Sequence, residues 1–156
     1  MNRIAINLIV NGRPRDLLVE PNATLADSLR EQAGTNSVHL GCEHGVCGAC
    51  NIYLEGAVVR SCLTLAAPCD GMEVTTLEGL DDATATALKD AMHRHHGLQC
   101  GFCTPGMLIT GHDMLTRGLC DSEPEIRQQL CGNICRCTGY QGIVAAIADT
   151  RNEMAP

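Results

Sequence analysis

Cysteines are the residues of this sequence that could carry chemistry, because they are numerous and occur at characteristic spacings. The chain has 156 residues and 11 cysteines, an odd number that fits a fully disulfide-paired, secreted protein poorly. The apolar stretch at residues 4–10 is short and lacks a small-residue cleavage site, so we predict no signal peptide. In a reducing compartment cysteines are more often metal ligands than disulfides. The sequence therefore predicts a cytoplasmic, metal-binding protein.

The first group of cysteines is suited to a binuclear iron–sulfur cluster. Cys42, Cys47 and Cys50 form a C-x4-C-x2-C pattern, and Cys62 comes from a separate segment further along the chain. This spacing is typical of plant-type [2Fe–2S] sites, because a short loop can wrap around the cluster. Glycines in the loop would let backbone N–H groups approach the sulfurs. A structural zinc site is the alternative, although zinc favours C-x2-C pairs.

The second group consists of two cysteine pairs. Cys100 and Cys103 precede Thr104–Pro105, with Thr104 the predicted N-cap of a helix and Pro at its first position. Cys135 and Cys137 follow after 31 intervening residues. Two such pairs can cover one metal site from two helix ends. Since zinc also uses paired cysteines, the spacing alone leaves iron–sulfur and zinc open for this site.

The other cysteines and the histidines are predicted to be structural. Free cysteine behaves as a small buried hydrophobic residue, which is the expectation for Cys69, Cys120 and Cys131. The histidines within residues 93–96 end a predicted helix, where partial positive charge suits the helix dipole. His112 is expected on the surface of a helix.

The first half of the chain is predicted to form a small α+β unit. Alternating apolar residues mark a strand at 4–10, and the turn Asn11–Gly12 leads to a return strand at 17–19. A helix is expected over residues 24–33, with Thr24 as its N-cap. Further strands are expected at residues 51–54, 57–62 and 72–77.

The second half is predicted to be helical. Helical spacing and cap or stop signals mark four segments, residues 82–96, 104–117, 122–131 and 140–151. Ser122 and Glu125 form a capping box for the third of them. We therefore expect two domains, residues 1–78 and 82–156, the second being a compact four-helix unit.

Composition excludes several classes of function. The formal net charge is −7, from 18 acidic and 11 basic residues, whereas non-specific nucleic-acid binding needs a basic footprint. No apolar run approaches the roughly 20 residues of a membrane-spanning helix. The sequence contains no evident catalytic triad or phosphate-binding loop. We expect no nucleic-acid partner and no membrane span, and the cysteines are the candidates for chemistry.

Three segments together resemble one protein family. Residues 41–50 (GCEHGVCGAC), 99–107 (QCGFCTPGM) and 132–140 (GNICRCTGY) are similar to motifs of the small iron–sulfur subunit of the molybdenum hydroxylases. This is the xanthine dehydrogenase and aerobic carbon monoxide dehydrogenase family. The resemblance covers about residues 3–150. It implies a β-grasp, ferredoxin-like N-terminal domain and a helical C-terminal domain, each with a [2Fe–2S] cluster.

The resemblance also implies which residues hold cofactors. The first cluster would be bound by Cys42, Cys47, Cys50 and Cys62, and the second by Cys100, Cys103, Cys135 and Cys137. Gln99 would hydrogen-bond the pterin of a molybdenum cofactor on a partner subunit, and Cys137 would lie close to it. Two positions depart from the usual pattern. His39 stands where many members have Lys, and Cys131 stands where a small residue such as Ser is usual.

The implied function is that of an electron relay. A large subunit would carry molybdopterin and hydroxylate a substrate, a medium subunit would carry FAD, and two such heterotrimers would form a dimer. This chain would pass single electrons from the molybdenum centre to FAD and would bind no substrate itself. The sequence does not indicate which substrate the large subunit takes. Arg136, between two ligands, is a candidate for tuning the reduction potential. The alternatives are a free-standing ferredoxin-like carrier and a zinc-stabilised interaction module.

Overall fold

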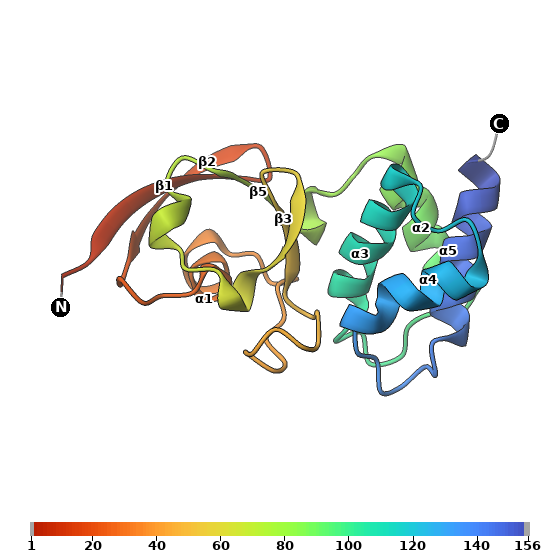
Figure 1. The fold of residues 1–156 in the computed structure, drawn as a ribbon. Helices are drawn as coiled ribbons and strands as arrows, with labels where there is room; N and C mark the ends of the chain where they lie inside the picture. The colour runs from red at the N-terminus through yellow and green to blue at the C-terminus, as the bar shows by residue number, and fades with distance from the viewer. Residues whose placement is uncertain (1, 155–156) are drawn as a thin grey trace.

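The computed structural model describes residues 2–154 and has two unlike halves (Figure 1). A curved sheet with short helices forms one half, where the N-terminus lies. Longer helices form the other half, where the C-terminus lies. The α+β fold predicted from the sequence is confirmed.

Five strands form one mixed sheet in the order β2-β1-β5-β3-β4. β1 (Ile4–Val10) and β2 (Arg13–Val19) pair antiparallel. Asn11 and Gly12 between them have φ values of 52° and 72°, the left-handed conformation that a two-residue hairpin turn needs. β5 (Glu73–Thr75) lies parallel to β1 and antiparallel to β3 (Asn51–Leu54), and β4 (Ala57–Arg60) pairs antiparallel with β3 at the edge.

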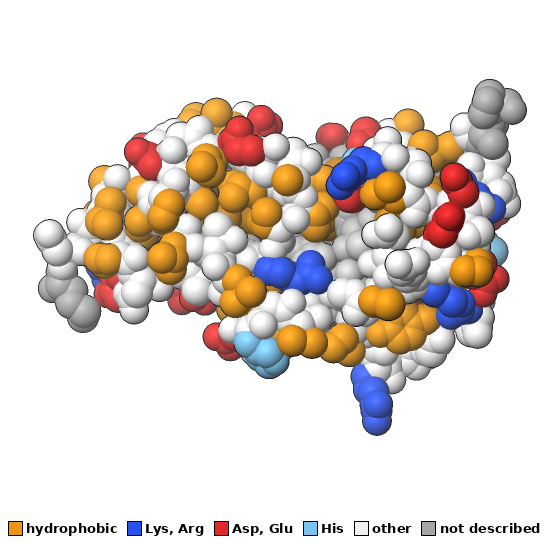
Figure 2. Space-filling view, viewed as in Figure 1, with side chains coloured by type: hydrophobic (Ala, Val, Ile, Leu, Met, Phe, Trp, Pro, Cys, Tyr) orange, Lys and Arg blue, Asp and Glu red, His pale blue; other side chains and the backbone are white. Residues whose placement is uncertain are grey.

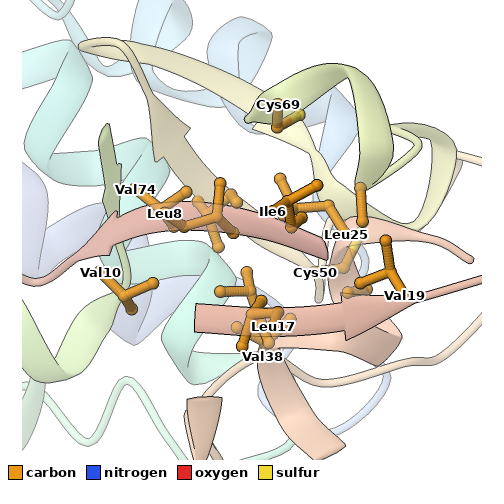
Figure 3. Close-up of a cluster of buried hydrophobic side chains, with 14 of the residues drawn as sticks. Ile6, Leu8, Val10, Leu17, Val19, Leu25, Val38, Cys50, Cys69 and Val74 are labelled. Carbon is orange, nitrogen blue, oxygen red and sulfur yellow. The ribbon is translucent and has the colours of Figure 1, made fainter. Parts of the chain in front are cut away.

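A hydrophobic core lies against one face of this sheet (Figure 3). Because side chains alternate across a strand, β1 turns Ile6, Leu8 and Val10 to the core and leaves the intervening residues exposed. α1 (Leu25–Ser28) packs Leu25 onto this face. The core also includes two cysteines of the first group, Cys50 and Cys62.

Several segments of the first half depart from the sequence prediction at their ends. The helix expected over 24–33 begins at its predicted cap, Thr24, but continues after α1 as a π-helical turn at Leu29–Ala33. The strand expected over 57–62 ends at Arg60, and a 3-10 turn follows at Ser61–Leu63. At the start of this turn the Ser61 hydroxyl donates to the carbonyl of Cys50 at 2.7 Å, which ties the turn to the end of the first cysteine loop.

The return strand and the last strand also differ in length. β2 begins at Arg13 rather than at 17, because residues 13–16 pair with residues 7–10 of β1. β5 is shorter than the predicted strand at 72–77 and is followed by a 3-10 turn at Leu77–Gly79. A further 3-10 turn at Ala67–Cys69 was not predicted.

The second half consists of α2 (Ala83–Arg94), α3 (Thr104–Arg117), α4 (Glu123–Gln129) and α5 (Gln141–Met154). The predicted capping box of Ser122 and Glu125 is present, and Asp82 caps α2 through the N–H of Ala85. Thr104 is not the N-cap predicted for α3, because that position is Cys103. Buried side chains of all four helices form a second core, Leu88, Met92, Met107, Met114, Ile126, Ile143 and Ile147.

The two halves meet where α3 packs against β3 (Figure 1). Here the Tyr53 hydroxyl lies 2.8 Å from Nδ1 of His112, whose Nε2 lies 2.8 Å from a carboxylate oxygen of Asp82. The prediction that His112 lies on a helix surface is wrong, since it is only 8% exposed. Burial and the carboxylates of Asp113 and Asp82 raise the pKa of Tyr53, so its hydroxyl stays protonated and can donate to His112.

Within residues 2–154, no helix is both long and apolar enough to cross a membrane.

Candidate metal centres

The first cysteine group lies in the loop before β3 and in the turn after β4. The loop is drawn in orange to yellow in Figure 1 and projects from the first half beside the helices. Cys50 and Cys62 are 2% and 7% exposed and belong to the core, whereas Cys42 and Cys47 are half-buried in the loop. The side chain of Cys47 acts on the pKa of Cys42, and that of Cys50 acts on the pKa of Cys62, so the members of each pair are neighbours. The four residues are therefore brought together as two pairs.

Glycine is required in this loop by close contacts and by backbone conformation. A Cβ on Gly41 would lie 3.1 Å from Sγ of Cys47. Gly45 and Gly48 have φ values of 84° and 71°, which residues with a side chain rarely adopt. The loop thus curls tightly around its cysteines, as the sequence analysis expected.

Backbone N–H groups in the loop favour a thiolate. The N–H groups of His44 and Cys47 donate to Sγ of Cys42, the latter at 3.4 Å, and lower the pKa of Cys42 to about 6. Burial raises the pKa of Cys62 to about 11, with a further contribution from the adjacent Cys50. A bound metal would have to stabilise the buried thiolate, whereas the loop thiolate is already favoured at neutral pH.

The second cysteine group also forms two pairs, one outer and one inner. Sγ of Cys100 lies 3.6 Å from Sγ of Cys137, and both residues are exposed. Cys135, which is 8% exposed, is the neighbour of the half-buried Cys103 and acts on its pKa. The structure therefore brings together all four cysteines of the second predicted group.

The inner pair contains thiols with opposite pKa shifts. Burial, followed by the neighbouring Cys135, raises the pKa of Cys103 to about 12. Burial also acts on Cys135, but the Thr138 hydroxyl, at 3.1 Å from its Sγ, and backbone N–H groups outweigh it and lower its pKa. Next to Cys103, the buried Thr104 hydroxyl has no hydrogen-bond partner among the described residues. The Thr104 hydroxyl could therefore donate a hydrogen bond to a ligand of the second cysteine group.

Pairs of thiols fit a binuclear cluster better than a single zinc ion. Each iron of a [2Fe–2S] cluster takes two protein thiolates, whereas a structural zinc ion draws four ligands around one point. The donor set of both groups therefore fits two [2Fe–2S] clusters.

A network of hydrogen bonds joins the two groups. The N–H of Ile134 donates to the carbonyl of Cys47 at 2.9 Å. The Asn133 side chain donates to the carbonyl of Gly106 at 3.2 Å and accepts from Thr110 at 3.1 Å. The amide of Asn51 donates to the same Thr110 hydroxyl at 2.8 Å. These residues were missed by sequence reasoning, although Asn51 follows Cys50 directly.

Backbones approach closely at this junction because glycines lack side chains. A Cβ on Gly48 would lie 2.5 Å from the carbonyl oxygen of Gly132. A Cβ on Gly106, in the first turn of α3, would overlap the carbonyl oxygen of Gly48. The junction is therefore a contact of main chain with main chain.

The other residues singled out by the sequence have distinct positions. Gln99 is exposed beside Cys100, and Arg136 is exposed between its neighbouring cysteines. Cys69 and Cys120 are each 2% exposed, as predicted, but the prediction for Cys131 is wrong because it is exposed. His39, one of the unusual positions, stacks on the ring of Phe102, with ring centres 4.8 Å apart.

Exposed apolar side chains adjoin both cysteine groups in the chain and together form an apolar rim. Figure 2 shows hydrophobic side chains gathered along the lower edge of this face, next to a His. The large exposed residues adjoining the two groups in the chain are Val46, Leu63, Leu98, Phe102 and Ile134. Clusters of exposed apolar side chains mark surfaces that contact other proteins. The rim therefore indicates a partner surface around the cysteines.

Comparison with known proteins identifies the family. Residues 8–80 match the model of the 2Fe-2S iron-sulfur cluster binding domain, and residues 76–148 match that of the [2Fe-2S] binding domain. The chain is 48% identical over 153 residues to the nicotine 6-hydroxylase small subunit of Paenarthrobacter nicotinovorans, spanning 98% of this chain and 93% of the relative. The chain belongs to the family of small iron–sulfur subunits of molybdenum hydroxylases. Its role is electron transfer in a molybdenum-dependent oxidoreductase, and the comparisons do not support the two alternatives.

Solved structures of this family share the fold. Quinoline 2-oxidoreductase from Pseudomonas putida 86 matches with a TM-score of 0.90 and 46% identity, over 98% of this chain and 96% of that chain. The aldehyde oxidoreductase of Desulfovibrio gigas matches with a TM-score of 0.85 and 38% identity, over 98% of this chain but 18% of that longer chain. The predicted combination of a ferredoxin-like and a helical [2Fe–2S] domain is confirmed.

The glycine contact at the junction can be tested with Gly106→Ala. Alanine in a helix is normally favoured over glycine by up to about 1 kcal/mol. Here the added methyl group would meet the carbonyl of Gly48, so we expect the free energy of unfolding to fall by about 1–3 kcal/mol. Urea denaturation of the cluster-loaded chain measures the change. An equal or higher stability in the variant would contradict the contact.

Proposed function

We propose that this chain holds two [2Fe–2S] clusters and relays electrons from molybdopterin on a large subunit to FAD on a medium subunit. The ligands of the first cluster would be Cys42, Cys47, Cys50 and Cys62, and those of the second Cys100, Cys103, Cys135 and Cys137. The corresponding domains would be residues 1–78 and 82–156. The grouping of eight cysteines into four neighbouring pairs is the observation that carries this proposal.

The cysteine pairs also suggest which iron each would hold. Cys42 with Cys47 and Cys50 with Cys62 would each bind one iron of the first cluster, and Cys100 with Cys137 and Cys103 with Cys135 would do so in the second. When bound, each cluster would accept and release one electron at a time. Backbone N–H groups and the Thr138 hydroxyl would stabilise the negative charge on the sulfurs.

The exposure of the second group supports a direction for the relay. The outer pair, Cys100 and Cys137, is exposed beside Gln99. This side would face the partner's pterin, with Gln99 offering its amide as a hydrogen-bonding group. The inner pair contains Cys135. The residue before it, Ile134, donates its N–H to the carbonyl of Cys47. A path of main-chain covalent bonds from Cys135 to Ile134, followed by this one hydrogen bond to Cys47, would thus connect the two ligand sets.

The apolar rim also suggests how this chain would be assembled with its partner subunits. The apolar rim around the cysteines would be covered by the molybdenum-containing subunit. The complex would be a dimer of heterotrimers in the cytoplasm, where reducing conditions keep the eleven cysteines available as thiols.

The relatives also support a substrate class for the complex. Caffeine dehydrogenase subunit gamma of Pseudomonas sp. strain CBB1 is 48% identical over 94% of this chain and 90% of its own length. With the nicotine and quinoline enzymes above, this gives three matches named for nitrogen-containing aromatic rings at 46% identity or more. We therefore propose that the large subunit hydroxylates a carbon of an aromatic nitrogen heterocycle.

Substrate oxidation by the purified complex tests this class. We expect reduction of an electron-accepting dye with quinoline, nicotine or caffeine at a rate at least tenfold above that with benzaldehyde. Faster oxidation of the aldehyde would assign the complex to the aldehyde-oxidising branch without changing the role of this chain.

Iron counting tests the ligand assignment. The complex, purified through a tag on this chain, should contain about four irons per copy of the chain, as two [2Fe–2S] sites require, together with molybdenum. Cys100→Ser should reduce the iron content to about two and abolish turnover with external acceptors, because it removes a ligand of the second site. The electron paramagnetic resonance signal of the first cluster should remain.

Cys131→Ser is the matched control, since Cys131 is exposed like Cys100 but is not a proposed ligand. It should retain four irons and full turnover. Zinc instead of iron in the unaltered chain, or intact turnover in Cys100→Ser, would overturn the proposed relay.

Gln99→Ala tests the proposed contact with the pterin. Because Gln99 is exposed and is not a proposed ligand, both clusters should form with unchanged iron content. Loss of the hydrogen bond should slow reduction of the clusters by substrate about tenfold, as monitored by absorbance in stopped flow. Reduction at the unaltered rate would argue against a pterin role for this residue, and so would loss of a cluster signal.

A further inference from the structure

Arg60 makes more contacts to the cysteine segments than its sequence position suggests. It is the last residue of β4 and precedes Cys62 by two positions. Its Nε donates to the carbonyl of Gly45 at 3.2 Å, and its Nη2 donates to the carbonyl of Gly132 at 2.7 Å. Its Nη1 donates to the side-chain oxygen of Asn51. All three bonds are partly buried, so one guanidinium joins three separate segments.

Each acceptor of Arg60 lies next to a proposed cluster ligand. Gly45 is two residues before Cys47, and Asn51 directly follows Cys50, so both belong to the first site. Gly132 is three residues before Cys135 and belongs to the second. The guanidinium is therefore bonded to the ligand segments of both sites. Figure 2 shows basic side-chain atoms at the junction of the two halves.

The contact between the two cysteine segments needs the hydrogen-bond donors of the Arg60 guanidinium. The carbonyl of Gly132 is held close to Gly48 in a contact that leaves no space for a Cβ. Carbonyl oxygens brought together in a partly buried place need donors, because an unpaired buried acceptor costs about 1–3 kcal/mol. A planar guanidinium supplies donors in several directions at once and stays charged, whereas a lysine offers a single point of charge.

We infer that Arg60 is a positioning residue for electron passage between the two cluster sites. Its guanidinium holds the segment of Gly132 against the loop of Gly45 and so keeps the Ile134 N–H on the carbonyl of Cys47. Its positive charge lies between the two sites and favours the reduced, more negative state of both clusters. This inference rests on the proposed ligand sets.

The same observations change the expectation for Arg136. That residue lies between two proposed ligands but is exposed to solvent, where a charge is screened. Arg60 is half-buried and bonded to both segments. Of these two arginines, Arg60 therefore has the larger electrostatic influence on the proposed clusters.

Two variants of the purified complex separate the charge of Arg60 from its hydrogen bonds. Arg60→Lys keeps the charge but cannot reach all three acceptors, and Arg60→Met removes both. Arg117→Met is the control, because Arg117 is an exposed residue of α3 that pairs with Asp113 one turn earlier. Iron content and the spectra of both clusters are measured first in every variant.

Hydrogen exchange of the Ile134 amide reports the junction directly. We expect exchange at least tenfold faster in both Arg60 variants than in the unaltered complex and in Arg117→Met, because the bond to Cys47 opens more often. Redox titration measures how the charge of Arg60 affects the midpoint potentials of the clusters. The midpoint potentials of the clusters should fall in Arg60→Met and stay near the original values in Arg60→Lys. Electron passage between the clusters, followed by freeze-quench paramagnetic resonance, should slow at least tenfold in both variants.

The outcomes distinguish this inference from the proposed function. Four irons in every form, with unaltered exchange, potentials and electron passage in both Arg60 variants, would overturn the role of Arg60 and leave the relay intact. Loss of iron from Arg60→Lys would also overturn it, since Arg60 would then serve cluster retention. An unaltered complex without four irons would instead refute the proposed ligand sets themselves.

Discussion

The close contact of main chain with main chain between the two cysteine segments is the constraint on which the rest of the structure depends. Residues 47–48 of the first loop lie directly against residues 132–134 of the second segment. This approach is possible because Gly48 and Gly106 have no side chains, and it is held by the Ile134 N–H and by the amide of Asn133. The sheet and the helices thus serve to bring two loops from distant parts of the chain into register.

The chain combines two opposing requirements in its thiols. A buried thiol resists ionisation, as Cys62 and Cys103 show, yet a metal ligand must be a thiolate. Each group combines a thiol whose pKa is raised by burial with one whose pKa is lowered by local donors, Cys42 in the loop and Cys135 beside Thr138. The thiol with the lowered pKa would be the more readily ionised ligand of each proposed cluster.

Local features could be predicted from the sequence, and contacts between distant segments could not. The cysteine spacing, the Asn11–Gly12 turn and the Ser122 capping box each depend on a few neighbouring residues, and all are present. His112 was wrongly predicted because its burial depends on Tyr53 and on the cap of another helix. Arg60 was missed for the same reason, since its acceptor Gly132 is 72 residues away in sequence. The ligand sets and the domain boundary stay predictions.

The exposed position of Cys100 and Cys137, together with the apolar rim, has a consequence for how the protein is studied. Without its partners, the outer side of the second site is open to bulk water. Hydration stabilises charge, and solvent exposure is one of the determinants of a cluster's reduction potential. A partner that covers Phe102 and Ile134 would exclude that water. The driving force for electron flow would therefore be a property of the assembled complex, and titrations of this chain alone would report a different midpoint.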